Sequence, residues 1–465
     1  FETVQQAQDR VCETAAYYTK NPKLYERKFK EYSYLNMINY STPVWANMGF
    51  DNPNSPVACY VMGVEDTTHS ITSAVSEMAA LAKHGGGLGI HMNKIRGFGA
   101  PISAGGISHG VVPWVDLYAT TIEKVSQGGV RRGNGALYVD IDHPDFYDFL
   151  KFRRTNDDID LGITIGDDFI KRCDNGDTEA RKRHNALLKE RMEMGEPYIV
   201  YIDRVNRARP DIYKHLGLQV HGSNLCSEIT LHTSPKYTGV CVLSSLNLSL
   251  YDLWKGSDLP EVAIVFLNAV NDHFIHKMDG VKGFEKAVAY ARKFRSLGLG
   301  VLGWQSHLQK NMIPFESYEA MRRNNLTFKE IKEGALNGAN NNAHLLAIAP
   351  TRSNAIVANA SRSIEPWTAN LHVRKENKNV FLVKNNELDR LIKSKYNENY
   401  DEIWKDIELN NGSVQGLKWF NDDEQKVFKT FAEIDQKAVI MQAEQRAKYI
   451  CQAASTLSLI HISEP

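Results

Sequence analysis

The chain has 465 residues, of which 43% are hydrophobic and 24% are charged, and its 55 basic residues balance 55 acidic ones. This composition is typical of an ordinary globular protein, and a zero net charge offers no overall field to attract nucleic acid or an anionic membrane. No apolar run approaches the ~20 residues that cross a bilayer, and the N-terminus lacks a basic-then-apolar signal pattern. We therefore expect a cytoplasmic protein that binds neither nucleic acid nor membrane.

Residues 1–38 are predicted to be helical, with aromatic and aliphatic residues at helix-like spacing. A loop from Ser41 leads to a short extended run, Val57–Gly63, and then to a helix capped near Asp66 or Thr67. The chain starts at Phe1 inside the predicted helical segment. We therefore expect a fragment of a longer protein.

The middle of the chain combines Gly-rich stretches, short β-like runs and helices. The stretches 84–89 and 127–135 are rich in glycine and lie beside apolar runs. Residues 223–250 look extended, with two β-like runs joined by a polar turn at 233–238, and residues 268–297 look helical. Alternating helices and buried strands predict an α/β protein, and the length favours a closed barrel over an open sheet.

The segment Ser223–Ile229 has the most informative pattern. Asn224, Cys226 and Glu228 stand at alternate positions, so on an extended chain all three side chains would face the same way. An amide, a thiol and a carboxylate on one face suit a hydroxylated substrate with the thiol against its carbon skeleton. The alternative is an ordinary strand with a buried cysteine, a common place for that residue. A buried Glu228 would be costly without partners, which favours a site.

Two further cysteines stand in β-like runs: Cys59 in 56–62 and Cys241 in 239–244. By pattern alone they fit a hydrophobic core equally well. The six cysteines form no CxxC pair and no zinc-like cluster, so we expect neither a disulfide framework nor a metal site in this chain.

Several motifs together resemble the large subunit of class I ribonucleotide reductases, from about Tyr40 to Ala454. They are STPV (41–44), HGGGLGIHMNKIR (84–96), SQGGVR (126–131), NLCSEI (224–229), CVLSSLNL (241–248) and APTRSNAIVANASRSIEP (349–366). The resemblance implies a ten-stranded α/β barrel of two antiparallel halves, with an internal finger loop carrying the radical cysteine. It divides the chain into an incomplete helical segment (1–38), the catalytic barrel (39–456) and a family-unlike tail (457–465).

The same resemblance implies the chemistry, an oxidoreductase that converts ribonucleoside diphosphates to deoxyribonucleotides. Cys226 looks like the cysteine that becomes a thiyl radical and takes the 3′-hydrogen. Glu228 would be the base towards the 3′-hydroxyl, assisted by Asn224. Cys59 and Cys241 look like the redox pair that closes to a disulfide, which requires Cα atoms within about 7 Å.

Nucleotide contacts are implied in the same way. The residues that match the family's substrate-phosphate positions are Thr42, Gly86, Gly87, Thr351, Ser353 and Asn354. The effector site at a homodimer interface corresponds to Asp66 and Arg96, and the relay loop that follows it to Gln127 and Arg131. Without the motifs around it, each charged residue of the effector site and relay loop would be interpreted as an ordinary solvated surface residue.

The resemblance also implies partners that the chain does not itself contain. A metal-containing small subunit supplies the radical, thioredoxin or glutaredoxin rereduces the site, and dNTP or ATP effectors bind as magnesium complexes, in a bacterial or phage-infected cell. Class I relatives carry a pair of adjacent tyrosines beyond the last barrel segment and then a cysteine-bearing tail, and neither follows the YICQA sequence here. We expect a barrel fragment lacking both ends.

Three alternatives stay open at this point. An adenosylcobalamin-dependent reductase shares the barrel and the three cysteines, although the YICQA sequence at 449–453 favours class I. A non-catalytic nucleotide-binding relative would be expected to lose a cysteine. A cysteine hydrolase would need a general-base histidine aligned with Cys226, and the local sequence suggests none.

Overall fold

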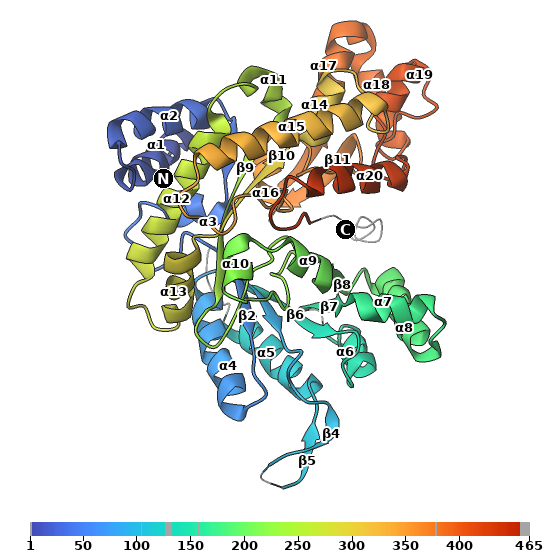
Figure 1. Ribbon diagram of the computed structural model, residues 1–465. Coiled ribbons are helices and arrows are strands. Elements are labelled where there is room, and N and C mark those ends of the chain that lie inside the picture. Colours follow the sequence, from blue (N-terminus) through green and yellow to red (C-terminus); the bar gives the residue numbers. More distant parts are fainter. Residues whose placement is uncertain (1, 104, 126–132, 157, 377–378, 456–465) are drawn as a thin grey trace.

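Figure 1 shows the computed structural model, which describes residues 2–103, 105–125, 133–156, 158–376 and 379–455. The chain begins with two helices, α1 (Val4–Tyr17) and α2 (Pro22–Tyr34). Thr3 starts the first with a capping box, and Asn21 caps the second directly before its N-terminal proline. Both helices pack against the long helix α12 (Leu259–Met278). The helical prediction for 1–38 is thus confirmed from Val4 to Tyr34, in two helices, whereas Ile38 begins a strand.

One mixed, curled sheet forms the centre of the molecule. Among the described residues it has eight strands: β1 (Ile38–Tyr40), β2 (Cys59–Gly63), β3 (Gly87–His91), β6 (Asn134–Asp140), β7 (Asp160–Ile165), β8 (Tyr198–Tyr201), β9 (Gly239–Asn247) and β10 (Leu297–Leu302). Within this sheet β2, β3, β6, β7 and β8 follow one another, and each pairs in parallel with the next. β9 pairs in parallel with β10 but antiparallel with β1 and β2. Two opposed sets of strands therefore meet where β9 joins β2, as expected for the barrel, while the count of ten strands stays a prediction.

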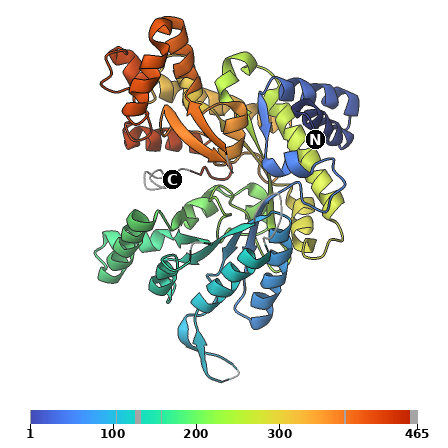
Figure 2. The same ribbon diagram turned by 180° about the vertical axis from the view of Figure 1, so that it is seen from behind.

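Helices surround this sheet in both views (Figures 1 and 2). β3, β7, β9 and β10 are almost wholly buried, as strands covered on both faces should be. The helices not yet given are α3 (Thr42–Asn47), α4 (Thr68–Lys83), α5 (Val112–Val125), α6 (Phe146–Phe152), α7 (Asp167–Asp174), α8 (Thr178–Met194), α9 (Ile202–Ala208), α10 (Asp211–His215), α11 (Tyr251–Trp254), α13 (Glu285–Phe294), α14 (Trp304–Lys310), α15 (Tyr318–Asn337), α16 (Arg352–Ala358) and α20 (Gln436–Ala447).

Two parts stand away from the sheet. The hairpin of β4 (Phe98–Pro101) and β5 (Ile107–His109) projects from the lower end in Figure 1. A C-terminal lobe has its own apolar cluster, which includes Leu388, Ile403 and Trp404. Its elements are β11 (Leu371–Glu376), β12 (Asn379–Lys384), α17 (Asn386–Lys395), α18 (Tyr400–Leu409) and α19 (Asp422–Val427). Short 3₁₀ turns occupy Leu248–Leu250 and Asn397–Asn399.

Three local predictions need correction. The expected loop after Ser41 contains α3, because Pro43 suits the first turn of a helix. Residues 268–297 form two helices with a break at 279–284, and not one. The largest error is at 223–250, where only β9 and an isolated bridge between Ser234 and Tyr237 are β structure. By contrast, the cap near Thr67 is confirmed, since its hydroxyl accepts the Ser70 N–H.

Candidate functional site

Cys59 and Cys241 lie directly opposite each other on neighbouring strands. Cys59 opens β2 and is the register partner of Cys241 in the antiparallel strand β9. Opposite residues in such a pair have Cα atoms about 4.5–5.5 Å apart, which falls within the range that a disulfide spans. No disulfide joins cysteines in this structure. Gly298 of β10 leaves room for the Cys241 thiol, because a Cβ there would meet its sulfur at 3.1 Å.

The loop that carries Cys226 is a tight turn and not a strand. Ser227 has a φ of 64°, and its N–H donates to the Asn224 carbonyl at 3.3 Å. The prediction of an extended segment is therefore wrong, and the alternation of residues 224, 226 and 228 does not by itself put them on one face. The turn forms because contacts with distant strands hold the backbone in this shape.

Close packing on β3 places this loop inside the curl of the sheet. A Cβ at Gly89 would lie only 1.8 Å from the Ser223 carbonyl oxygen, so only glycine admits the loop there. A Cβ at Gly87 would meet the side chain of Leu225 at 3.3 Å. Because Gly87 is the register partner of Cys59, the residue before Cys226 lies over the strand that borders the cysteine pair.

Tyr138 of β6 supports the same turn. Its hydroxyl donates to the Asn224 carbonyl at 2.6 Å and lies 3.1 Å from the Ser227 hydroxyl. Burial raises the pKa of Tyr138 far above its ordinary value, with further contributions from the nearby Cys226 and Glu228 charges. The hydroxyl therefore stays protonated and keeps its role as a donor.

Asn224 and Glu228 are each 1% exposed. The Asn224 side-chain oxygen accepts the Ile229 N–H at 3.0 Å, whereas its amide nitrogen has no hydrogen-bond partner in the described structure. Burial raises the pKa of Cys241 well above its usual value, and the charges of Cys59 and Glu228 add to this effect. The carboxylate, the amide and the cysteine pair thus share one buried neighbourhood.

The predicted phosphate residues fall into two groups. Thr351 stands at the N-cap position of α16, and its hydroxyl accepts the Ser363 N–H at 2.8 Å instead of an N–H of the helix. Asn354 donates to the Tyr40 carbonyl at 2.8 Å, which brings α16 against β1, two residues before Thr42 at the start of α3. Ser353 lies in the first turn of α16.

The other group is the glycine pair at the start of β3. The N–H groups of Gly86 and Gly87 already donate to the carbonyls of Leu81 and Ala58. These two glycines therefore allow another group to approach the backbone closely, but their N–H groups are already used in hydrogen bonds.

At the expected effector site, Arg96 Nε lies 2.6 Å from Asp66 Oδ2, and Arg96 also donates to the Pro101 carbonyl in the β4–β5 hairpin. The pair is partly exposed. Gln127 and Arg131 lie outside the described residues.

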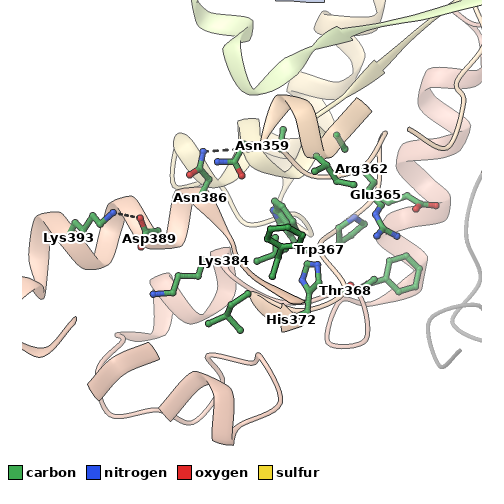
Figure 3. Close-up of a pocket in the computed structure, with 18 of the residues that line it drawn as sticks. Asn359, Arg362, Glu365, Trp367, Thr368, His372, Lys384, Asn386, Asp389 and Lys393 are labelled. Carbon is green, nitrogen blue, oxygen red and sulfur yellow. Dashed lines mark hydrogen bonds and ion pairs between the residues drawn. The ribbon is translucent and has the colours of Figure 1, made fainter. Parts of the chain in front are cut away.

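A separate cavity of about 610 Å³ lies between α16 and the C-terminal lobe (Figure 3). None of the predicted site residues that the structure describes lines it. Its Lys393 pairs with Asp389 at 2.7 Å, and Asn386 donates to the Asn359 carbonyl.

Two residues of the site were not predicted from the sequence. Tyr138 donates to the loop, and Gln452 contacts both Cys241 and the loop. Tyr138 reads as one more apolar strand residue, and Gln452 as part of the YICQA end motif. Both are recognised only from contacts with residues far away in the sequence.

Comparison with known proteins identifies the family. The model of the ribonucleotide reductase barrel domain matches residues 57–180, 172–341 and 332–460. The chain therefore belongs to the ribonucleotide reductase family, and it is an oxidoreductase of the large-subunit type with the α/β barrel fold that the sequence predicted.

Particular relatives support the same conclusion. A Frog virus 3 protein named for the large subunit of ribonucleoside-diphosphate reductase is 32% identical over 93% of this chain and 82% of its own length. The large subunit of Invertebrate iridescent virus 3 is 29% identical over 97% of this chain and 85% of its own. The solved class Id alpha subunit of Actinobacillus ureae matches with a TM-score of 0.88 and 34% identity, over 97% of this chain and 87% of its own. The adenosylcobalamin-dependent and non-catalytic alternatives are accordingly not favoured.

No helix among the described residues is long and apolar enough to span a membrane. No group of three or more His, Cys, Asp or Glu side chains in the same part of the chain could hold a metal ion.

Proposed function

We propose that this chain reduces ribonucleoside diphosphates with Cys226 as the radical residue and with Cys59 and Cys241 as the reductant. The observation that carries the proposal is the row Cys241–Cys59–Gly87 across β9, β2 and β3, with Leu225 lying on Gly87. One substrate sugar above this row would have the radical cysteine on one side and the reducing pair on the other.

The residues divide the reaction between them. A Cys226 thiyl radical takes the 3′-hydrogen, Glu228 accepts the proton of the 3′-hydroxyl, and the Asn224 amide donates a hydrogen bond to that oxygen. The 2′-hydroxyl leaves as water, and Cys59 and Cys241 together supply two hydrogens and form a disulfide. Cys226 then returns its hydrogen to C3′ and Glu228 returns the proton to the 3′-oxygen, so that the nucleotide and two thiols give the deoxynucleotide, water and one disulfide.

Substrate and effector contacts complete the proposal. The hydroxyls of Thr42, Thr351 and Ser353, with Asn354, hold the diphosphate near the start of α16. Effector nucleotides, as magnesium complexes, bind beside Asp66 and Arg96 at the interface of a homodimer, and Gln127 and Arg131 pass the signal on.

The proposed reaction needs further proteins as partners. A metal-containing small subunit supplies the oxidising equivalent that makes the Cys226 radical. A thioredoxin or glutaredoxin reopens the disulfide, and the enzyme acts in the cytoplasm of a bacterial or phage-infected cell.

A single-turnover experiment tests the cysteine pair. Prereduced holoenzyme without external reductant should form up to one deoxynucleotide per site and a Cys59–Cys241 disulfide, detected by peptide mapping. Cys59→Ser should form neither. Cys173→Ser, a matched change at a half-buried cysteine of α7, should behave as the unmodified enzyme. A disulfide between other cysteines, or full activity of Cys59→Ser, would refute the proposal.

A further inference from the structure

Residues 451–455, here called the clamp segment, bind the Cys226 loop to the opposite half of the sheet. The Ala453 N–H donates to the Glu228 carbonyl at 3.0 Å, and the Ala453 carbonyl accepts the Ile348 N–H at 3.0 Å. The Cys451 sulfur accepts N–H groups from Leu345 and Leu346, each at 3.1 Å. The clamp segment is therefore fixed on one side by 345–348 and holds the loop on the other.

Gln452 belongs to the clamp segment, and both the nitrogen and the oxygen of its carboxamide make hydrogen bonds. Its Nε2 donates to the Cys241 sulfur at 3.4 Å and to the Leu297 carbonyl of β10 at 3.0 Å. Its Oε1 accepts the Thr230 N–H at 3.1 Å, two residues after Glu228. A single side chain thus joins one thiol of the cysteine pair to the loop that carries the radical cysteine and the base.

We propose that Gln452 is a positioning residue that stabilises the reduced form of the cysteine pair and couples its redox state to the Cys226 loop. The proposal rests on the function proposed above for Cys59 and Cys241. In this proposal the Gln452 carboxamide takes no part in the chemical step, and it positions groups that do.

The chemistry behind this assignment is the change in sulfur as the disulfide forms. Closure of the pair oxidises two thiols, releases two hydrogens to the substrate carbon and the leaving water, and makes one S–S bond. A thiol or thiolate sulfur accepts a hydrogen bond better than a disulfide sulfur does, because it carries more negative charge. The Gln452 bond therefore favours the dithiol, and it opposes the effect of burial by lowering the pKa of Cys241.

The bond between the Gln452 oxygen and the Thr230 N–H couples the cysteine pair to the loop. When the Cys241 sulfur turns towards Cys59, the Gln452 Nε2 loses one of its two acceptors and keeps the Leu297 carbonyl. The oxygen of the same amide holds the Thr230 N–H. We expect the loop beside Glu228 to loosen when the pair is oxidised, which would open it towards an external reductant.

The first test measures the reduction potential of the Cys59–Cys241 pair in this chain by dithiol titration and peptide mapping. Gln452→Met keeps the size of the side chain and removes its donor. Loss of one hydrogen bond should favour the disulfide about fivefold, a shift of about 20 mV to more negative potential at 29.6 mV per tenfold. Gln415→Met is the matched control, because its carboxamide donates to the Gln425 carbonyl in the C-terminal lobe; it should leave the potential unchanged.

Gln452→Glu is the second variant, because it keeps an acceptor for the Thr230 N–H and loses the Nε2 donor to the Cys241 sulfur and the Leu297 carbonyl. It should shift the potential in the same direction and slow alkylation of Cys241 at pH 8.5. A potential equal to that of the unmodified chain in both variants would overturn the role of Gln452. A failure to map Cys59–Cys241 in the unmodified chain would instead overturn the proposed function, so the two outcomes are distinct.

Hydrogen exchange on the unmodified chain tests the coupling without any substitution. Peptides covering 228–231 and 449–455 should exchange at least twofold faster in the disulfide form than in the dithiol form. Peptides of the C-terminal lobe should not change. Equal exchange in both redox forms would show that the clamp segment does not respond to the cysteine pair, and the coupling would be wrong.

Discussion

Tyr138→Phe removes one hydroxyl and leaves the ring in place. In the structure that hydroxyl donates to the Asn224 carbonyl at 2.6 Å, while the other donor to this carbonyl, the Ser227 N–H, lies at 3.3 Å. A buried neutral hydrogen bond contributes about 1 kcal/mol net. If the whole loss of about 1 kcal/mol raises the activation barrier through a poorer placement of Cys226, kcat should fall about fivefold, because 1.36 kcal/mol corresponds to a tenfold change in rate.

The substrate KM should change by less than about twofold, since Tyr138 lies under the turn and not among the proposed nucleotide contacts. The assay is steady-state reduction of a ribonucleoside diphosphate by a holoenzyme that contains the complete large subunit. Tyr118→Phe is the matched control. Its hydroxyl is also buried and donates to a backbone carbonyl, that of Ile71, at 3.0 Å, but it lies on α5 away from the turn.

The control should lose a similar amount of stability, measured by thermal unfolding, and keep its kcat. An unchanged kcat in Tyr138→Phe, or an effect confined to KM, would refute the positioning role of the hydroxyl. An equal loss of kcat in both variants would show that general destabilisation, and not the turn, limits the reaction.

Three further predictions follow from the same contacts. Glu228→Gln should lower turnover at least about 100-fold and change nucleotide binding less than twofold, because it removes a base and not a binding contact; equal losses in calorimetric binding and in turnover would assign Glu228 a structural role. Gly89→Ala should destabilise the fold by about 3 kcal/mol, since its Cβ would lie 1.8 Å from the Ser223 carbonyl oxygen; urea unfolding with a normal midpoint would contradict the close packing. Burial lowers the pKa of His91 and His344 to about 3 each, so below pH 6.5 the unfolded chain binds protons that the folded chain does not. The free energy of unfolding should therefore fall with pH from about 6.5 downwards, by about 1.4 kcal/mol per pH unit for each histidine, and replacing either histidine by glutamine should flatten this slope in urea titrations at pH 5 to 7.

The sequence predicted the helices at 1–38 and the cap at Thr67 because the signals for them are local. Capping residues and apolar spacing act within one or two turns of helix. The segment 223–229 could not be predicted in this way. Its alternating residues fit a strand, but the backbone turns at Ser227 because Tyr138 and β3 hold it from outside the segment.

The identity of the chemistry was already present in the sequence. The spacing of Asn224, Cys226 and Glu228 by itself also fitted an ordinary strand with a buried cysteine. The family motifs around them indicated a reductase, because such motifs can be recognised in the sequence whichever way the loop is folded.

The resemblance already implied that Cys59 and Cys241 form a pair, but only the tertiary structure decided how the groups of the site meet. The pairing of Cys59 with Cys241, the passage of the loop over Gly89, and the contact of Gln452 with both the thiol and the loop all join segments distant in the chain. A shift of one residue in strand register would turn either cysteine to the other face of the sheet, and the sequence pattern near each cysteine is the same for both registers. The register is fixed by the packing of the whole core, and so it appears only when the chain is folded.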